Sequence, residues 1–363
     1  MSDTSRVVFN ALRPGEDADA VAAALARVVA SGWYILGPEV EQFEAEFASA
    51  CHAPHAVGVG TGTDAITLIL RALDIGPGDE VITPPLSAAY SALAVMMAGA
   101  TPVFADIDPQ RLTIDPQAAA AAITPRTRAL LPVHLYGQSA DMTPLLALAE
   151  QHGLALVEDC AQAHLCTSEG RPVGTMGIAG AFSFYPTKNL GALGDGGAVV
   201  TRDATLAQRL RRLRNGGQTT RYHHEEAGAN SRLDEIQAAV LRARLPYLAR
   251  WTDRRRQIAQ TYRTGLAGTA VHVPPLCDDG HVYHLFPVLT SERTAFQAHL
   301  LAQGVETLIH YPVPIPRQPA LSSLHPRQCA VADRICGEVC SLPMYPSLSD
   351  LEVDRVIASV RSF

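Results

Sequence analysis

The chain has 363 residues, a formal net charge of −7 and only 18% charged residues, below the roughly 25% of ordinary domains. This composition excludes a disordered tail protein and a strongly basic nucleic-acid binder. No run of about 18 apolar residues occurs, and the first 16 residues contain no apolar signal core, so we expect a cytoplasmic protein without membrane contact.

Apolar segments alternate with amphipathic ones along the first two thirds of the chain. Helices are predicted at residues 17–30, 40–49, 64–73, 87–98 and 142–152. Strands are predicted at residues 55–60, 80–83, 102–105, 129–133, 155–158, 179–184 and 198–201. Apolar strands between helices predict an α/β fold with a mostly parallel sheet that is covered on both faces.

The last third of the chain predicts a second, smaller α/β unit. Residues 234–266 form a long helical pattern that Pro246 interrupts. A strand near residues 281–290 and helices near 294–303 and 329–339 follow. We therefore expect a large domain over residues 1–246 and a small domain over residues 247–363.

Lysine occurs once, at Lys188, whereas arginine occurs 28 times. Arginine replaces lysine where only charge is needed, but it stays protonated and cannot serve as a nucleophilic amine. Lys188 is therefore a candidate functional residue, with chance survival as the alternative. The seven cysteines include no C-x-x-C pair, so we expect reduced buried thiols and no metal site.

A glycine-rich segment, GVGTGTDA at residues 58–65, lies between a predicted strand and a predicted helix. It matches the dinucleotide fingerprint only in its loose form, and no lysine follows as in a Walker motif. It favours a cradle for a single phosphate at Gly62 and Thr63, where helix amides attract an anion. An ordinary strand–helix turn is the alternative.

Two further candidates follow predicted strands. Asp159 could hold a cation or a protonated ring nitrogen, or could cap a helix. Lys188 stands in a segment that opens with Ser183 and continues into four glycines at 191, 194, 196 and 197, typical of a loop near a cofactor or of a surface turn. Pyridoxal 5′-phosphate (PLP) needs such a set: an amine for its aldehyde, a carboxylate for its ring nitrogen and donors for its phosphate.

With these residues the chain resembles the DegT/DnrJ/StrS sugar aminotransferases, within the fold-type-I (aspartate aminotransferase-like) PLP enzymes. The resemblance covers nearly the whole chain. It rests on SGWYILGP (31–38), GTGTD (60–64), GPGDEV (76–81), GATPVF (99–104), EDCAQAH (158–164), SFYPTKNLG (183–191) and NSRLDEIQ (230–237).

The resemblance implies a role for each matching residue. Lys188 would form the Schiff base with PLP and move a proton, and Asp159 would pair with the pyridine nitrogen. Gln162 would contact the ring hydroxyl, and the phosphate would lie against Ser183, Gly62 and Thr63. Asn230 would reach the cofactor of a partner subunit, which implies a homodimer with shared active sites.

The sequence departs from the family pattern where relatives place an aromatic ring on the cofactor face. Ala88 occupies that position, and Tyr90 is a possible substitute. His164 is a second candidate for the ring face, although a hydrogen-bonded structural role is favoured.

The C-terminal half resembles the subgroup that acts on 3-keto-6-deoxyhexoses linked to a nucleotide. The segments are YHH (222–224), HVYHLF (281–286), IHYPVP (309–314) and LPMYP (342–346). By this resemblance Tyr185, His310 and Tyr311 would line the sugar site. We expect transfer of an amino group from an amino acid such as L-glutamate to a dTDP-linked ketosugar.

Four alternatives stay open at this stage. The first is a 4-aminotransferase acting on a 4-keto sugar. The others are a non-catalytic regulator on the same scaffold, a PLP-dependent sugar dehydratase, and a nucleotide-sugar or NAD-binding protein. The intact Lys188, Asp159 and Ser183 argue against a regulator, and Lys188 argues against the dehydratase variant that carries histidine at that position.

Overall fold

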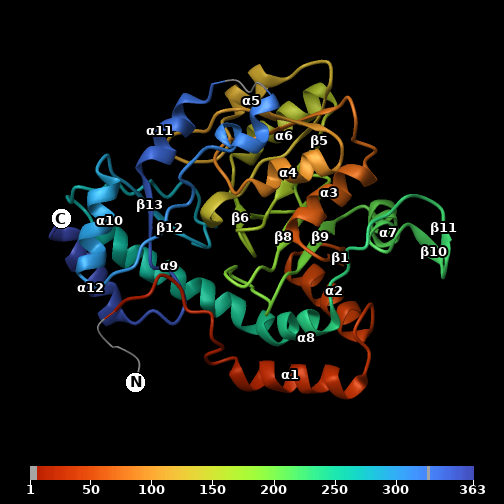
Figure 1. Cartoon of the computed structure of the whole chain (residues 1–363), viewed down its shortest axis with the longest axis horizontal. Coiled ribbons are helices and arrows are strands. Elements are labelled where there is room, and N and C mark those ends of the chain that lie inside the picture. Colours follow the sequence, from red (N-terminus) through yellow and green to blue (C-terminus); the bar gives the residue numbers. More distant parts are fainter. Residues whose placement is uncertain (1–5, 325–327) are drawn as a thin grey trace.

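The computed structural model describes residues 6–324 and 328–363 (Figure 1). Within them, seven strands form one sheet, and β9 runs antiparallel to both of its neighbours. The other four strand pairs of the sheet are parallel, which confirms the predicted mostly parallel sheet. The sheet order is β1 (His55–Val59), β9 (Gly197–Thr201), β8 (Ala179–Ser183), β5 (Ala155–Asp159), β4 (Thr127–Leu130), β2 (Glu80–Thr83), β3 (Thr101–Phe104).

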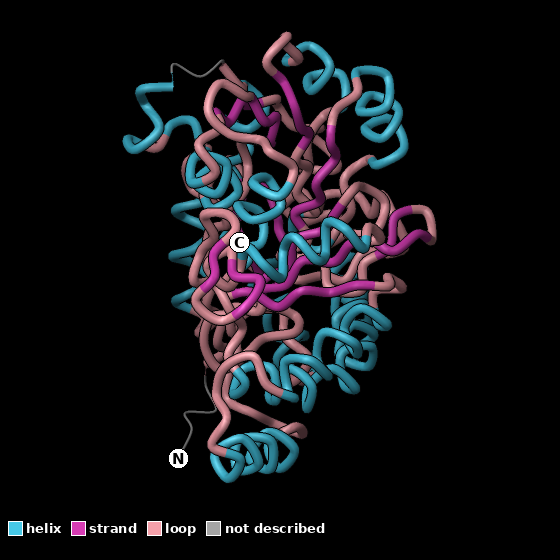
Figure 2. Tube along the Cα trace, turned by 90° about the vertical axis from the view of Figure 1, so that its right-hand side faces the viewer, coloured by secondary structure: helices cyan, strands magenta, loops and turns pink. Residues whose placement is uncertain are grey.

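Helices cover both faces of this sheet, and Figure 2 shows the strands between them. Side chains alternate along each strand, so Val57 of β1 faces α3 and α7 whereas Ala56 faces α2 and α8. The helices are α1 (Ala18–Ser31), α2 (Pro38–Ala50), α3 (Gly62–Ala72), α4 (Tyr90–Met97), α5 (Pro116–Ala122), α6 (Met142–His152), α7 (Ala204–Leu213) and α8 (Glu235–Arg244).

The C-terminal part builds its own core. Ile258 and Tyr262 of the long helix pack against Phe286 and Val356, and Val7 from the N-terminal segment joins them. Its elements are α9 (Leu248–Gly265), β12 (Phe286–Leu289), α10 (Arg293–Ala302), α11 (Ala330–Glu338), β13 (Val339–Leu342) and α12 (Asp350–Arg361). A domain boundary at residue 246 stays a prediction.

The helical pattern of residues 234–266 appears as two helices, α8 and α9, joined by the short 3₁₀ turn Leu245–Tyr247. Pro246 lies in that turn, as its missing N–H predicts. Helix α4 begins at Tyr90 instead of residue 87, because Ser87 and Ala88 belong to a loop that lines a cavity. The hairpin of β10 (Gln218–Thr220) and β11 (His223–His224) was not predicted, because its residues are polar and exposed.

Among the described helices, none combines the length and the apolar character that a bilayer crossing requires.

Candidate active site

A cavity of about 600 Å³ opens at the edge of the sheet where β2, β5 and β8 end. Parallel strands place their carboxyl ends on one edge, so the loops that follow them converge there. Of the ten residues that the sequence singled out, nine line this cavity and one, Asn230, does not. The nine are Gly62, Thr63, Asp159, Gln162, Ser183, Tyr185, Lys188, His310 and Tyr311.

Lys188 lies in the loop that follows β8, where its N–H donates to the carbonyl of Tyr185 at 2.8 Å. Burial lowers the pKa of its amine from 10.5 to about 8, and the negative charge of Asp159 opposes this shift. At pH 7 roughly a tenth of the amine is therefore unprotonated, far more than for an exposed lysine. An unprotonated amine can attack a carbonyl carbon and can accept a proton.

Asp159 ends β5 and is 5% exposed. Its Oδ2 accepts a hydrogen bond from the Ser91 hydroxyl at 2.7 Å, and its Oδ1 accepts one from the Ala161 N–H at 3.0 Å. Two donors hold the carboxylate in one orientation and stabilise its charge. Sequence reasoning missed Ser91, because it lies 68 residues from Asp159.

Gln162 links the sheet edge to the C-terminal part. Its Oε1 accepts the Tyr136 N–H at 2.6 Å, and its Nε2 donates to the Tyr311 hydroxyl at 3.0 Å. Burial raises the pKa of Tyr311 to about 12, and the Gln162 hydrogen bond opposes the rise. The Tyr311 hydroxyl thus stays protonated and can donate into the cavity.

The first turn of α3 faces the end of β8 closely. A Cβ on Gly62 would lie 2.7 Å from Cβ of Ser183, so only glycine allows this approach. Thr61 caps the helix by accepting the Asp64 N–H, whereas the N–H groups of Gly62 and Thr63 have no partner among the described residues. Free amides at a helix N-terminus beside a hydroxyl form a suitable cradle for a phosphate.

Histidines from the C-terminal part complete the cavity wall. His310 hydrogen-bonds Ser341 Oγ through Nδ1 at 3.0 Å, and burial together with the positive Lys188 lowers its pKa to about 4. His284 hydrogen-bonds Asn189 Oδ1 at 3.2 Å, and burial lowers its pKa well below 6.5. Both rings are therefore neutral at pH 7. His284 was not among the predicted site residues, although it lies in one of the segments that carry the resemblance.

The missing aromatic residue leaves a small side chain at the cavity wall. Ala88 and Tyr90 both line the cavity, and Tyr90 is 64% exposed. Asn230 is exposed and pairs with Asn215 through an isolated bridge, outside the cavity lining. A role of Asn230 toward a partner subunit stays a prediction.

A buried network braces the strand that carries Asp159. Glu158 accepts the N–H groups of Gly174, Met176 and Gly177 at 2.7 to 2.9 Å and lies 3.1 Å from Nε2 of His134. Glu158, His134 and Cys160 are close enough to share a metal ion. Their hydrogen bonds already engage both carboxylate oxygens, so the network serves the structure of the site.

His164 is fully buried against Phe182 and Phe184, outside the cavity lining. Neither ring nitrogen makes a hydrogen bond of normal geometry among the described residues, and only the Ser183 backbone stabilises the protonated ring to some extent. The structure therefore does not support the favoured hydrogen-bonded role. The local sequence could not show this, because the aromatic neighbours come from another strand. Burial and the positive Lys188 lower its pKa to about 3, and the Ser183 carbonyl offsets only part of this shift.

We expect His164→Leu to stabilise the protein by about 1–3 kcal/mol, because leucine removes an unsatisfied buried polar group. The unfolded chain binds a proton at His164 near pH 6.5, whereas the folded chain does so near pH 3. Stability from this site is therefore present above pH 6.5 and lost as the pH falls toward 3, and the variant should lack this loss.

Denaturant unfolding at pH 7 and pH 5 measures both effects. His134→Leu is the matched control, since His134 is equally buried but accepts the Ala140 N–H at 3.0 Å and contacts Glu158. His134→Leu should destabilise the protein. Equal destabilisation by both replacements contradicts the prediction.

Comparison with known proteins assigns the chain and its fold to a family. Residues 16–361 match the DegT/DnrJ/EryC1/StrS aminotransferase family. The chain belongs to this family. The expected fold class and the expectation of an aminotransferase are thereby confirmed.

One similar protein of known activity and two similar crystal structures are informative. The dTDP-3-amino-3,4,6-trideoxy-alpha-D-glucose transaminase of Streptomyces venezuelae is 52% identical over 345 residues, which cover 94% of this chain and 91% of that protein. The crystal structure of S. venezuelae DesV in complex with a ketimine intermediate has a TM-score of 0.97 and 51% identity, covering 99% and 98% of the two chains. Bacillus subtilis NtdA, with bound cofactor PMP, has a TM-score of 0.92 and 32% identity, covering 99% and 85%.

Proposed function

We propose that this aminotransferase binds PLP and transfers an amino group from an amino acid, L-glutamate, to a dTDP-linked 3-keto-6-deoxyhexose. The product is the nucleotide-linked 3-amino sugar. The observation that carries the proposal is the cavity itself, where the chain's only lysine meets a fixed carboxylate and free helix amides. The similarity to the dTDP-3-amino-3,4,6-trideoxy-alpha-D-glucose transaminase of S. venezuelae supports the substrate class.

The residues present fit PLP. Gly62, Thr63 and Ser183 would hold its phosphate, Asp159 its ring nitrogen and Gln162 its ring hydroxyl. When bound, PLP supplies an aldehyde that an amine can attack and a protonated ring that withdraws electrons from the carbon next to nitrogen.

Different residues of the chain would bind the cofactor, move the proton and position the sugar. Lys188 would offer Nζ as the nucleophile that holds the cofactor, and the same atom, when unbonded, would carry a proton to and from the reacting carbon. Asp159, oriented by the Ser91 hydroxyl, would keep a proton on the ring nitrogen, because its negative charge would raise the pKa of that nitrogen. Tyr185, His310 and Tyr311 would position the sugar.

We also propose a homodimer in the cytoplasm, with Asn230 reaching the partner's cofactor. Asn230 is exposed on the described chain, which leaves it accessible to a second copy.

A product assay tests the substrate assignment. The purified enzyme is incubated with PLP, L-glutamate and either the 3-keto or the 4-keto dTDP-6-deoxyhexose, and the products are identified by NMR. We expect a 3-amino sugar and one equivalent of 2-oxoglutarate. Amination of the 4-keto sugar alone would establish the alternative regiochemistry, and consumption of neither sugar would refute the proposed substrate class.

A further inference from the structure

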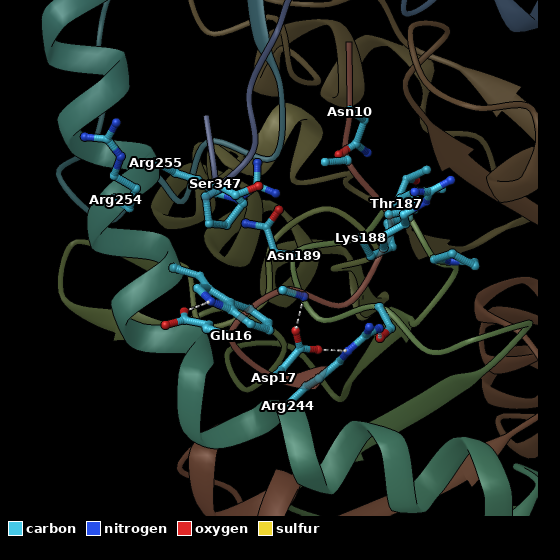
Figure 3. Close-up of a pocket in the computed structure, with 18 of the residues that line it drawn as sticks. Asn10, Glu16, Asp17, Thr187, Lys188, Asn189, Arg244, Arg254, Arg255 and Ser347 are labelled. Carbon is cyan, nitrogen blue, oxygen red and sulfur yellow. Dashed lines mark hydrogen bonds and ion pairs between the residues drawn. The ribbon is translucent and has the colours of Figure 1, made fainter. Parts of the chain in front are cut away.

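A second cavity, of about 460 Å³, lies on the other side of the loop that carries Lys188 (Figure 3). Its walls come from the N-terminal segment 10–17, the first turns of α9 and residues 346–347. Thr187 and Lys188 line both cavities, so this loop is the wall between them. Nothing in the proposed transfer reaction uses the second cavity.

Five arginines line the cavity, and three of them pair with acids. Arg244 donates to Asp17 at 2.8 Å in a buried ion pair, which Figure 3 shows at the cavity floor. Arg250 pairs with Glu16 at 2.5 Å on the exposed rim. Arg254 pairs with Asp350, which lies outside the lining, at 2.7 Å. Two arginines of the lining therefore remain without an ion pair among the described residues.

Arg255 carries a buried positive charge that no carboxylate among the described residues compensates. It is 4% exposed, and its Nη1 donates to the carbonyls of Tyr283, His284 and Met344. No carboxylate pairs with it among the described residues, and its Nε has no hydrogen-bond partner there. Burial lowers the pKa of Arg255 to about 10, which reflects the cost of an uncompensated charge.

Arg13 adds a second unpaired guanidinium. It is exposed, lines the same cavity and makes no ion pair or hydrogen bond within residues 6–324 and 328–363. A guanidinium presents a planar set of donors that matches carboxylate and phosphate oxygens. The volume of about 460 Å³ lies within the range of small-molecule pockets and exceeds the needs of a single inorganic ion.

We propose that this cavity binds a small organic oxyanion, with a phosphate or carboxylate group held by Arg13 and Arg255. The bound anion would compensate the buried charge of Arg255. The anion would also contact the loop of residues 186–189, so binding of the anion would affect the position of Lys188. The two sources of such a group are a dicarboxylate from the amino-acid side of the reaction and a nucleoside diphosphate from the sugar side.

The chain offers a direct fluorescent reporter. It has two tryptophans, and Trp251 lines this cavity, where its indole N–H donates to Glu16 at 2.6 Å. The exposed Trp33 lies outside the lining, so Trp33→Phe leaves Trp251 as the only tryptophan. The PLP-saturated protein is titrated with inorganic phosphate, 2-oxoglutarate and thymidine diphosphate. PLP saturation fills the proposed phosphate cradle at α3, but 2-oxoglutarate and thymidine diphosphate can still enter the cavity of the proposed reaction. Trp251 and Arg13 line only the second cavity, so the Trp251 signal and its dependence on Arg13 report binding there.

We expect a saturable change in Trp251 fluorescence with 2-oxoglutarate or thymidine diphosphate, and the tighter of the two identifies the source. In the same background, Arg13→Ala should weaken binding by about tenfold, as expected for loss of one charge-assisted hydrogen bond. Arg255→Gln should weaken it further. The matched control is Arg171→Ala, which should change nothing, because Arg171 is exposed, lies outside the lining of this cavity and makes no ion pair with a described residue.

The absence of any saturable signal at millimolar concentrations would overturn the proposal. Equal affinities of the Arg13→Ala and Arg171→Ala proteins would also overturn it, because the anion would then bind elsewhere. Should Arg255→Gln fail to fold, the Arg13→Ala comparison still decides. Fluorescence reports binding independently of amino transfer, so failure of the proposed substrate assignment leaves the test intact.

Discussion

Replacement of Lys188 by alanine is expected to reduce the rate of amino transfer by roughly 10⁴-fold, the upper range for loss of a general acid–base group. The variant loses both the nucleophile and the proton carrier. No other lysine can substitute, since the chain contains none. Single-turnover kinetics and the visible absorbance of the PLP-treated protein measure the effect.

Covalent attachment gives a readout besides activity. Borohydride reduction of the PLP-treated parent should mark one peptide, the one that contains Lys188, in mass spectrometry. Lys188→Arg is the matched control, because it keeps the positive charge but cannot form the bond. A label on another peptide, or full turnover by the alanine variant, would contradict the assignment of Lys188.

Asp159→Asn is expected to change two properties in opposite directions. Turnover should fall by about 10²–10³-fold, the range for removing one preorganised electrostatic contact. The amine of Lys188, however, should capture PLP faster at pH 7. The negative charge of Asp159 raises the pKa of Lys188, so its removal lowers that pKa below about 8 and increases the unprotonated fraction.

Stopped-flow absorbance after mixing apo-protein with PLP, recorded between pH 6 and 9, separates these effects. The parent rate should rise with pH with a midpoint near pH 8, and the midpoint of the variant should lie at lower pH. Asparagine can still accept the Ala161 N–H and can donate to Ser91, so the fold should survive. Asp195→Asn is the control, since Asp195 lines the same cavity but does not shift the pKa of Lys188. Unchanged profiles in Asp159→Asn would refute the coupling.

Local patterns predicted most of the sheet and of the helices that cover it. The apolar runs that became β1, β5, β8 and β9 carry their signal in consecutive residues. The C-terminal strands gave a weaker signal: β13 was not predicted, because its pattern continues that of α11 and only pairing with β12 separates the two.

The candidate site divides in the same way. Lys188 and Asp159 were identified because residue type and position after a strand are properties of the chain itself. Ser91 and His284 were missed, and His164 was misjudged, because each depends on which segments become neighbours. Gln162 and Tyr311, 149 residues apart, share a hydrogen bond that no local pattern encodes.

The sequence by itself determined which reactive groups are present. They are one lysine amine, a carboxylate at a strand end and a glycine at a helix N-terminus whose amide groups are free to bind an anion. Only the tertiary structure decided how these groups are tuned. Burial lowers the pKa of Lys188, Ser91 orients Asp159, and Arg255 is enclosed without a counter-ion. The physical reason is that desolvation and hydrogen bonding depend on distances between segments remote in the chain, which exist only after the sheet and its loops have assembled.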